Sequence, residues 1–200
     1  VGTFGSVNGR AYEINDNYRE FVFKNNMSAV INQDPTQTPA VDPEATDVQN
    51  EFAFGGDGPI NVKAGRAVYV GGTTDLFEDV EVIQDGAIIN SQEMTILRRE
   101  ATSDADGTLR LGEVNKIIAK QDFRYRTTEN DITGNQGVYE RDKSLITVTG
   151  DVRAKQTGGN TARTDRLTYN TVTETIRFSG NCQGPGCGRE GSTRVVISGN

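Results

Sequence analysis

Three short stretches of this 200-residue sequence carry residue types that could do chemistry, and a cysteine pair is the first. Cys182 and Cys187 stand in NCQGPGCG, a spacing found neither in CxxC redox motifs nor in four-ligand zinc sites. The chain has no histidine that could complete a metal shell. We therefore predict a disulfide that closes a glycine-rich loop, and such a bond persists only in an oxidising compartment.

The other two stretches match calcium and nucleotide motifs but lack the flanks that these motifs need. TSDADGTLRLGE places Asp104, Asp106 and Glu113 at EF-hand offsets, yet Thr102 replaces the first aspartate and the flanks alternate as strands do. GCGREG at 186–191 matches GxGxxG, but no parallel strand precedes it and no helix follows it. We interpret both stretches as loops and expect neither a metal nor a cofactor.

The composition narrows the function classes further. Without histidine the chain lacks the usual general base, and no pair of carboxylates stands out, so we name no catalytic residue; an enzyme that uses paired carboxylates is disfavoured but stays open. A net charge of −7 argues against nucleic acid as a partner, because phosphate binding needs a basic field. Small basic clusters are either solvated outer faces or contacts to an anionic head group: Arg98-Arg99, Arg124/Arg126 and Arg153/Lys155.

The elements that must position any site are strands. Apolar and polar residues alternate almost throughout, and no run approaches the ~20 apolar residues of a membrane-spanning helix. In residues 117–126, Ile117, Gln121, Phe123 and Tyr125 fall on one face of an expected regular strand. With 23 glycines and an apolar content of 34%, the pattern predicts an all-β fold without significant helix.

A turn signal recurs in the middle of these strands. It consists of an apolar residue, one spacer, a pair rich in Gly, Asn or Asp, and a second apolar residue four positions after the first. Gly and Asn tolerate positive φ, so each copy predicts a corner at which a strand bends while its apolar face stays inward. The copies are Val148–Val152, Phe178–Cys182, Phe23–Met27 and Leu76–Val80, with a partial copy from Ile132.

The composition also suggests a division of the chain. Residues 34–58 contain Pro35, Pro39 and Pro43 with several acids and no base, which is typical of a linker. We predict an N-terminal β-hairpin unit at 1–33 and a main β domain at 59–200. The sequence starts at Val1 without Met or a charged-then-apolar leader, so we expect a trimmed chain from which any signal peptide has been removed.

The period-two phase predicts which side chains share an apolar interior. A slip of one residue would invert every assignment on that strand. The residues expected to face inward are Val68, Val80, Val82, Ile117, Phe123, Tyr125, Ile146, Val148, Val152, Leu167, Tyr169, Ile176 and Phe178.

Two longer units resemble a known family. GVYERDKSLITVTGDVRAKQTGGNTARTDRLTYNTVTETIRFSGN is similar to the hairpin repeat of the OstA/LptA family of lipopolysaccharide-transport proteins, and INVKAGRAVYVGGTTDLFEDVEVIQDGAIINSQEMTI resembles the first such repeat. The similarity covers about 60–200. Two positions depart from the pattern: Glu78-Asp79 replace the glycine of the corner, and Cys182 stands where Val is expected.

The resemblance implies a fold, a ligand and partners. These would be an elongated, twisted, V-shaped β-jelly roll of stacked antiparallel strands, a periplasmic location, and an apolar groove that shelters lipid A acyl chains without catalysis. The family bridges inner-membrane and outer-membrane complexes of the same fold. Residues 1–33 resemble the end of the LptC-like partner, although an extra repeat is equally consistent with them.

Assembly and two alternative functions complete the expectations. Val195, Val196 and Ile197 lie in an uninterrupted terminal strand, which predicts an open edge and head-to-tail pairing with a further copy. A structural or adhesive β-repeat module that binds protein or glycan is the main alternative. A β-solenoid enzyme acting on polysaccharide is a third class, disfavoured by the missing histidine.

Overall fold

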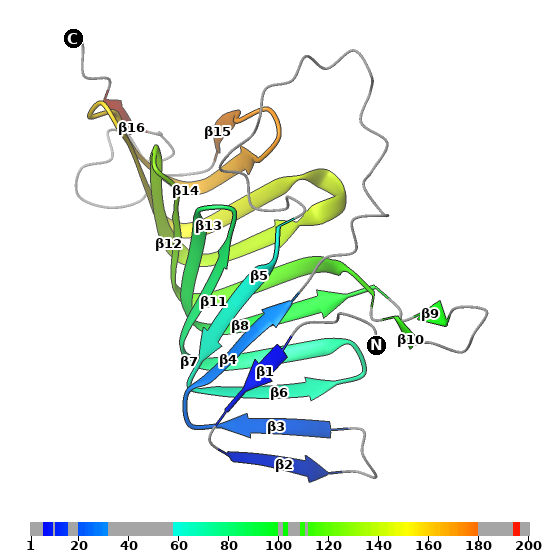
Figure 1. The fold of residues 1–200 in the computed structure, drawn as a ribbon. Coiled ribbons are helices and arrows are strands. Elements are labelled where there is room, and N and C mark those ends of the chain that lie inside the picture. Colours follow the sequence, from blue (N-terminus) through cyan, green and yellow to red (C-terminus); the bar gives the residue numbers. More distant parts are fainter. Residues whose placement is uncertain are drawn as a thin grey trace.

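The described part of the chain forms one antiparallel sheet of 14 strands and a separate two-stranded hairpin, β9–β10 (Figure 1). The computed structural model describes residues 6–9, 11–15, 20–31, 58–99, 102–103, 109–110, 112–179 and 194–196. A three-residue 3-10 helix, Arg141–Lys143, is the one helix in these ranges, and none there is long and apolar enough to cross a bilayer. The predicted all-β fold is confirmed.

The strand bounds follow the alternating segments of the sequence. They are β1 (Ser6–Asn8), β2 (Ala11–Asn15), β3 (Glu20–Lys24), β4 (Met27–Ile31), β5 (Ile60–Ala64), β6 (Arg66–Val70), β7 (Thr73–Gln84), β8 (Ala87–Arg98), β9 (Thr102–Ser103), β10 (Leu109–Arg110), β11 (Val114–Arg126), β12 (Asn130–Glu140), β13 (Leu145–Gln156), β14 (Thr161–Asn170), β15 (Ile176–Ser179) and β16 (Arg194–Val196).

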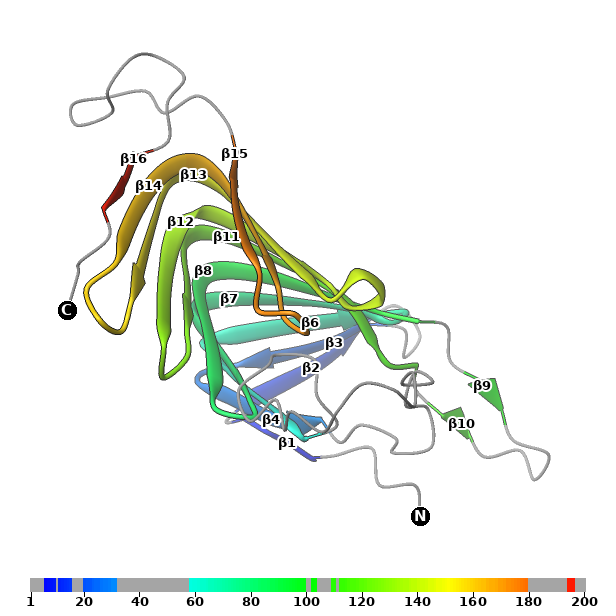
Figure 2. The same ribbon diagram turned by 90° about the horizontal axis from the view of Figure 1, so that it is seen from above.

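The sheet is folded along its length into two walls, which Figure 2 shows as a V. Six strands run through both walls: β7, β8 and β11 to β14. Eight shorter strands form four pairs, with one strand of each pair in either wall: β1 with β2, β3 with β4, β5 with β6, and β15 with β16. We call each such strand or pair of strands a rung, and the described sheet has ten rungs. The first wall contains β1, β4, β5, β16 and the halves 80–84, 87–91, 123–126, 130–134, 152–156 and 161–164. The second wall contains β2, β3, β6, β15 and the halves 73–77, 93–98, 114–120, 136–140, 145–149 and 166–170.

Pairs of residues with left-handed backbone form the corners of alternate rungs. The pairs are Asn25-Asn26, Glu78-Asp79, Gln121-Asp122 and Gly150-Asp151, all with positive φ. The second residue is Asn or Asp each time, which are the non-glycine residues that enter this region at least cost. The corners predicted at Phe23–Met27, Leu76–Val80 and Val148–Val152 are confirmed.

Two predictions about corners need correction. The strand at 117–126 is not regular, because Gln121 and Asp122 form a corner and Gln121 is exposed rather than inward. The partial copy from Ile132 has no left-handed residue: Gly134 is absent from the positive-φ residues of the described chain. Glycine is needed there for space, since a Cβ would approach Val148 Cγ1 to 2.5 Å.

The described strands of residues 1–33 belong to the same sheet as the rest. β4 pairs with β5 and β3 pairs with β6, so these N-terminal strands add two rungs to both walls. This continuity is what an extra repeat requires. The division into units at 1–33, 34–58 and 59–200 stays a prediction, and residues 32–57 lie outside the described ranges.

The segment between β8 and β11 leaves the sheet and returns. β9 and β10 pair antiparallel within it, as expected for a loop between strands. Glu113, the last residue of the calcium-like motif, pairs with Arg141 at 3.3 Å, while Asp104 and Asp106 lie outside the described residues.

The corner geometry gives a stability prediction at two adjacent exposed residues. Gln121→Gly removes the Cβ clash of a left-handed residue, so we expect the free energy of unfolding to stay equal or rise by up to about 1 kcal/mol. Lys120→Gly, in regular strand, should lower it by about 1 kcal/mol. Urea unfolding of the two variants measures these changes. If Gln121→Gly lowers the free energy of unfolding as much as Lys120→Gly does, the assigned corner is contradicted.

Candidate functional site

The inner faces of the two walls enclose the apolar interior. In the second wall, cross-strand pairing aligns one row along the stack, which runs through Phe21, Tyr69, Thr74, Ile96, Ile117, Tyr139, Ile146, Tyr169 and Ile176. A row nearer the corner contains Phe23, Ala67, Leu76, Met94, Ala119, Gly137, Val148, Leu167 and Phe178. Neither row contains a charged residue, so these two rows form a continuous uncharged surface.

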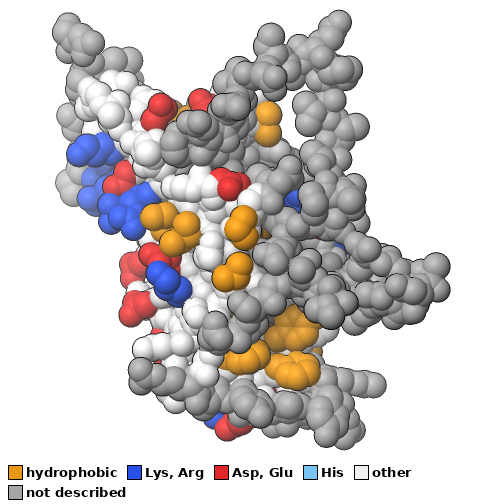
Figure 3. Space-filling view, in the orientation of Figure 1, with side chains coloured by type: hydrophobic (Ala, Val, Ile, Leu, Met, Phe, Trp, Pro, Cys, Tyr) orange, Lys and Arg blue, Asp and Glu red, His pale blue; other side chains and the backbone are white. Residues whose placement is uncertain are grey.

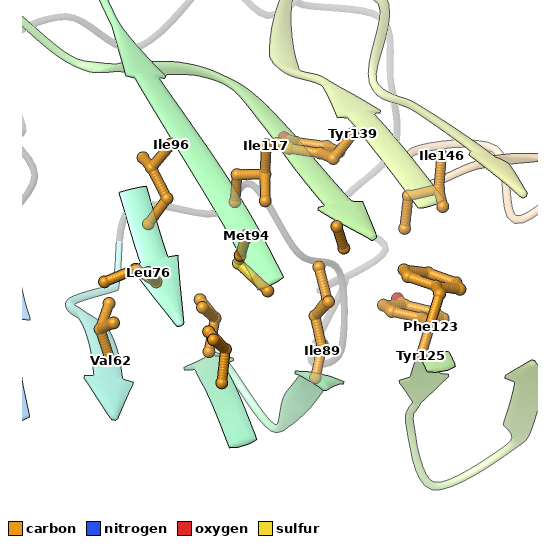
Figure 4. Close-up of a cluster of buried hydrophobic side chains, with 14 of the residues drawn as sticks. Val62, Leu76, Ile89, Met94, Ile96, Ile117, Phe123, Tyr125, Tyr139 and Ile146 are labelled. Carbon is orange, nitrogen blue, oxygen red and sulfur yellow. The ribbon is translucent and has the colours of Figure 1, made fainter. Parts of the chain in front are cut away.

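The first wall presents a matching surface. Its middle row is formed by Ala29, Val62, Val82, Ile89, Tyr125, Ile132, Ala154 and Ala162. Figure 4 shows Ile96, Ile117, Tyr139 and Ile146 on one side of the interior, with Ile89 and Tyr125 facing them. The two surfaces form a single cluster of buried apolar residues.

The corners decide how these rows meet. Because the two apolar residues of each corner are four positions apart, Val148 and Val152 both point inward, and both are 0% exposed. Close approach across neighbouring strands depends on glycine: a Cβ on Gly137 would meet the Phe123 ring at 2.1 Å. The Phe123 ring therefore fills the space over Gly137.

Aromatic side chains bring the two walls into contact. Tyr125 of the first wall and Tyr169 of the second have ring centroids 5.8 Å apart at an interplanar angle of 46°, a favourable tilted arrangement. Both are almost fully buried. In this part of the stack, side chains rather than an open channel fill the interior.

The two ends of the stack are less covered than its middle. At the N-terminal end Phe21 and Tyr69 are half-buried, with ring centroids 6.3 Å apart, and Figure 3 shows apolar side chains at the surface where β3 and β6 lie. At the C-terminal end Ile176 and Phe178 are half-buried against the core. Apolar surface thus remains available at the two ends of the described stack.

The interior lacks groups for acid–base or metal chemistry within the described residues. Its buried polar side chains are neutral: Gln84, Ser91, Thr164 and Thr171. Gln84 donates to the Gly58 carbonyl at 3.0 Å and Ser91 to the Glu93 carbonyl at 2.9 Å. No cluster of three His, Cys, Asp or Glu able to hold a metal occurs in these ranges.

The outer faces carry the charges. Arg124 donates two hydrogen bonds to Asp131, and these lower the pKa of that carboxyl. Arg153 and Arg163 both contact Asp151. The basic clusters at Arg124/Arg126 and Arg153/Lys155 therefore lie on the outer face of the first wall, largely paired and solvated.

A family comparison decides the class of protein to which this interior belongs. The model of the family described as LptA/(LptD N-terminal domain) LPS transport protein matches residues 60–175, more than half of the chain. The chain belongs to this family. The matched segment begins at β5 and ends just after β14, so it covers every rung that runs unbroken through both walls.

A solved structure shares the fold of this LPS-transport-family chain. It is LptH from Pseudomonas aeruginosa, described as the LptA-homologous periplasmic component of the conserved lipopolysaccharide transport device. The match has a TM-score of 0.57 and 14% identity, and covers 71% of this chain and 96% of LptH. No curated protein matched in the sequence search. The elongated, V-shaped β-jelly roll predicted from the sequence is confirmed.

The inward residues predicted from the phase are placed as follows. Val80, Val82, Ile117, Phe123, Tyr125, Ile146, Val148, Val152, Leu167 and Tyr169 lie in the buried cluster, and Ile176 and Phe178 pack against it. Val68 differs: it pairs with Asp75 and Val22 on the outer face, whereas its neighbour Ala67 is inward. Val68 and Val80 are an even number of positions apart, but the Gly71-Gly72 turn lies between them, and the alternation of inward and outward residues does not continue through a turn. Whether any of these residues contacts lipid stays a prediction.

Several interior residues were not predicted although a signal for them existed. Ile89, Met94 and Ile96 alternate in AIINSQEMTI, and Leu76 and Ile132 open corner copies. Cys182, Cys187 and Ile197 lie outside the described residues, so the disulfide stays a prediction. Val195 and Val196 belong to β16, which pairs with β14.

Burial of Tyr139 predicts a pH dependence of stability. Desolvation raises the pKa of Tyr139 from 10.0 to about 12. The neutral phenol therefore contributes stability that is complete below pH 10 and is lost as the pH rises through 12, by at most about 3 kcal/mol. Tyr139→Phe should flatten this part of the pH profile in urea unfolding between pH 9 and 12. An unchanged profile would show that Tyr139 is not buried as described.

Proposed function

We propose that this protein shelters lipopolysaccharide acyl chains between its two walls and passes the lipid along the stack of rungs without chemical change. The observation that carries the proposal is the pair of uncharged rows on the inner face of the second wall, which continue from Phe21 to Phe178 and are partly exposed at both ends. Burial of acyl methylenes contributes about 0.8 kcal/mol each, so an apolar surface suffices to hold several chains. The family assignment supports the choice of lipid.

Entry of a lipid requires the walls to move apart. The central residues are buried against one another. When an acyl chain enters there, these residues lose contacts with each other and gain contacts with the acyl chain. The half-buried residues at the two ends gain new contacts instead. We therefore place the first contact with lipid at an end of the stack and further progress along the V-shaped opening between the walls.

The location and partners of the proposed function come from the relatives. LptH is described as a periplasmic component of a lipopolysaccharide transport device. By that likeness we place this protein in the periplasm, as a link between membrane complexes of the same fold. An adhesive module that binds protein or glycan on its outer face is the alternative that lipid binding would exclude.

Photo-crosslinking at two adjacent residues of β15 tests the lipid site. Phe178 faces the interior and Arg177 faces outward on the same strand. With benzoylphenylalanine at Phe178, we expect irradiation to capture lipopolysaccharide at least about tenfold more efficiently than at Arg177, because apolar chains bury against the inner face. Gel shift and lipopolysaccharide immunoblotting give the readout. Equal capture at both positions, or capture at Arg177 alone, contradicts the proposed interior site.

We further propose that copies, or partners of the same fold, join end to end. In the described chain β1 and β2 each pair on one side only, as do β15 and β16, so each end presents one open rung spanning both walls. Successive rungs alternate in direction, and ten is an even number. The first rung of a second copy would therefore run antiparallel to the last rung of the first copy, with both walls continued.

The charge distribution favours this polar arrangement. Residues 1–113 contain 8 Lys and Arg against 19 Asp and Glu, a net charge of −11, whereas residues 114–200 contain 13 against 9, a net charge of +4. Attraction between the oppositely charged halves of two copies favours a head-to-tail order over contact between like halves. Elongation should therefore weaken as salt is added.

Proline in β16 tests the assembly edge. Successive N–H groups of an antiparallel strand point to opposite sides, so of Val195 and Val196 one donates to β14 and the other faces the open edge. In separate Val195→Pro and Val196→Pro variants, we expect the one that loses the outward donor to stay folded by circular dichroism and to stop elongating in sedimentation velocity. Elongation of both variants at the parent's concentration dependence would reject assembly through this edge.

A further inference from the structure

Arg98 stands in the inward phase of an otherwise apolar strand face. In β8 the inward residues Met94 and Ile96 are each 1% exposed, and Arg98 follows at the same period of two. It pairs with Val114, which is also buried. Arg98 therefore lies at the edge of the second wall away from the corners, where the interior meets the opening of the V.

The guanidinium of Arg98 has no counter-charge among the described residues. Its Nη1 donates to the Gly112 carbonyl at 3.3 Å, a long hydrogen bond, and the described residues give the guanidinium no acidic partner. Burial lowers the pKa of Arg98, which reflects the cost of holding this cation partly out of water. The nearby cations differ: Arg99 pairs with Asp142, and Arg141 pairs with Glu113.

Apolar surface lies next to this cation. The Arg98 backbone N–H donates to the Gly72 carbonyl at 3.1 Å, in the turn that follows β6, the strand that carries Tyr69. The Tyr69 ring packs on Phe21 in the partly exposed N-terminal part of the interior. A cation beside an open apolar surface is complementary to an amphiphile with an anionic head group. Guanidinium groups suit phosphate best, because their planar donors can bind two phosphate oxygens at once.

We propose that Arg98 binds a phosphate on the head group of the lipid whose acyl chains lie against the inner face near Tyr69. The inference rests on the proposed lipid function and adds to it an orientation, with head group at the edge of the second wall and chains inward. Arg98 then also obtains the counter-charge that it lacks within the described chain.

The test measures the binding of each protein variant to two lipids that differ by one phosphate. Diphosphoryl and monophosphoryl lipid A of equal acylation are bound to the full chain immobilised on a sensor surface. We expect the parent to bind the diphosphoryl form about tenfold more tightly, the effect of one charge-assisted contact. Arg98→Met should abolish this preference, and Arg98→Lys should keep part of it, because lysine retains the charge without the bidentate donors.

Arg99→Met is the matched control, because Arg99 is adjacent, exposed and paired with Asp142. It should keep the parent's preference. If Arg98→Met lowers affinity for both lipids equally, Arg98 only fastens the Gly112 loop and the inference is overturned. If Arg98→Met does not fold, the comparison of Arg98→Lys with the parent decides, since an unchanged preference there overturns the inference as well.

Two further outcomes separate the possible ligands. Parent protein that binds neither lipid refutes the proposed function itself, whereas equal binding of both lipids refutes only the role of Arg98. Inorganic phosphate forms another arm of the experiment. If millimolar phosphate raises the Tm of the parent but not of Arg98→Met, while the parent shows no lipid preference, the site takes free phosphate and the head-group proposal is overturned.

Discussion

The left-handed residue pair at the corner of every second rung is the constraint on which the rest of the structure depends. A strand that simply continued would give a flat sheet with one apolar face open to water. The paired left-handed residues, such as Gly150-Asp151, bend the strand sharply and consume two positions. Inward residues on both sides of the bend therefore stay in phase, and one sheet can cover its own apolar face. The intervening rungs follow this bend through cross-strand pairing, without left-handed residues of their own in β8, β12 and β14.

The folded sheet explains how a chain of low apolar content builds a long interior. With 34% apolar residues the sequence cannot form a thick core. Two thin walls need only one inward residue in two, and each wall supplies the cover for the other. The Tyr125–Tyr169 contact shows how closely the walls approach in the middle of the stack. Towards the two ends of the described stack, fewer side chains of the opposite wall cover these rows. The same rows that form the core are therefore partly exposed there. Core and proposed lipid surface are thus one continuous feature, graded along the stack.

The repeating rung also accounts for the proposed ends and for the position of Arg98. Each rung is stabilised by its two neighbours, so within the described chain the first and last rungs are the ones with an unpaired side. Charged groups are absent from the inner rows that neighbouring rungs share, but not from the free edge of a wall. Arg98 is found at such an edge, two residues beyond the last apolar inward position of β8. Its inward phase follows from the strand, and its partial access follows from its place beside the opening.

The sequence by itself determined the fold class, most of the inward phase and the main corners. These depend on local properties: period-two alternation, and the tolerance of Gly, Asn and Asp for left-handed backbone. It therefore placed Val148, Val152, Leu167 and Tyr169 on one inner face. The prediction from sequence was wrong at the Gln121-Asp122 corner, where no glycine signals the bend. It was also wrong at Val68, because a turn interrupts the alternation of inward and outward residues. Only the tertiary structure decided which strands are neighbours, that the described strands of 6–31 and 60–70 belong to the same sheet as the rest, and that Arg98 has no counter-charge among the described residues. These facts depend on register between segments far apart in the chain, and alternation within one strand carries no information about register.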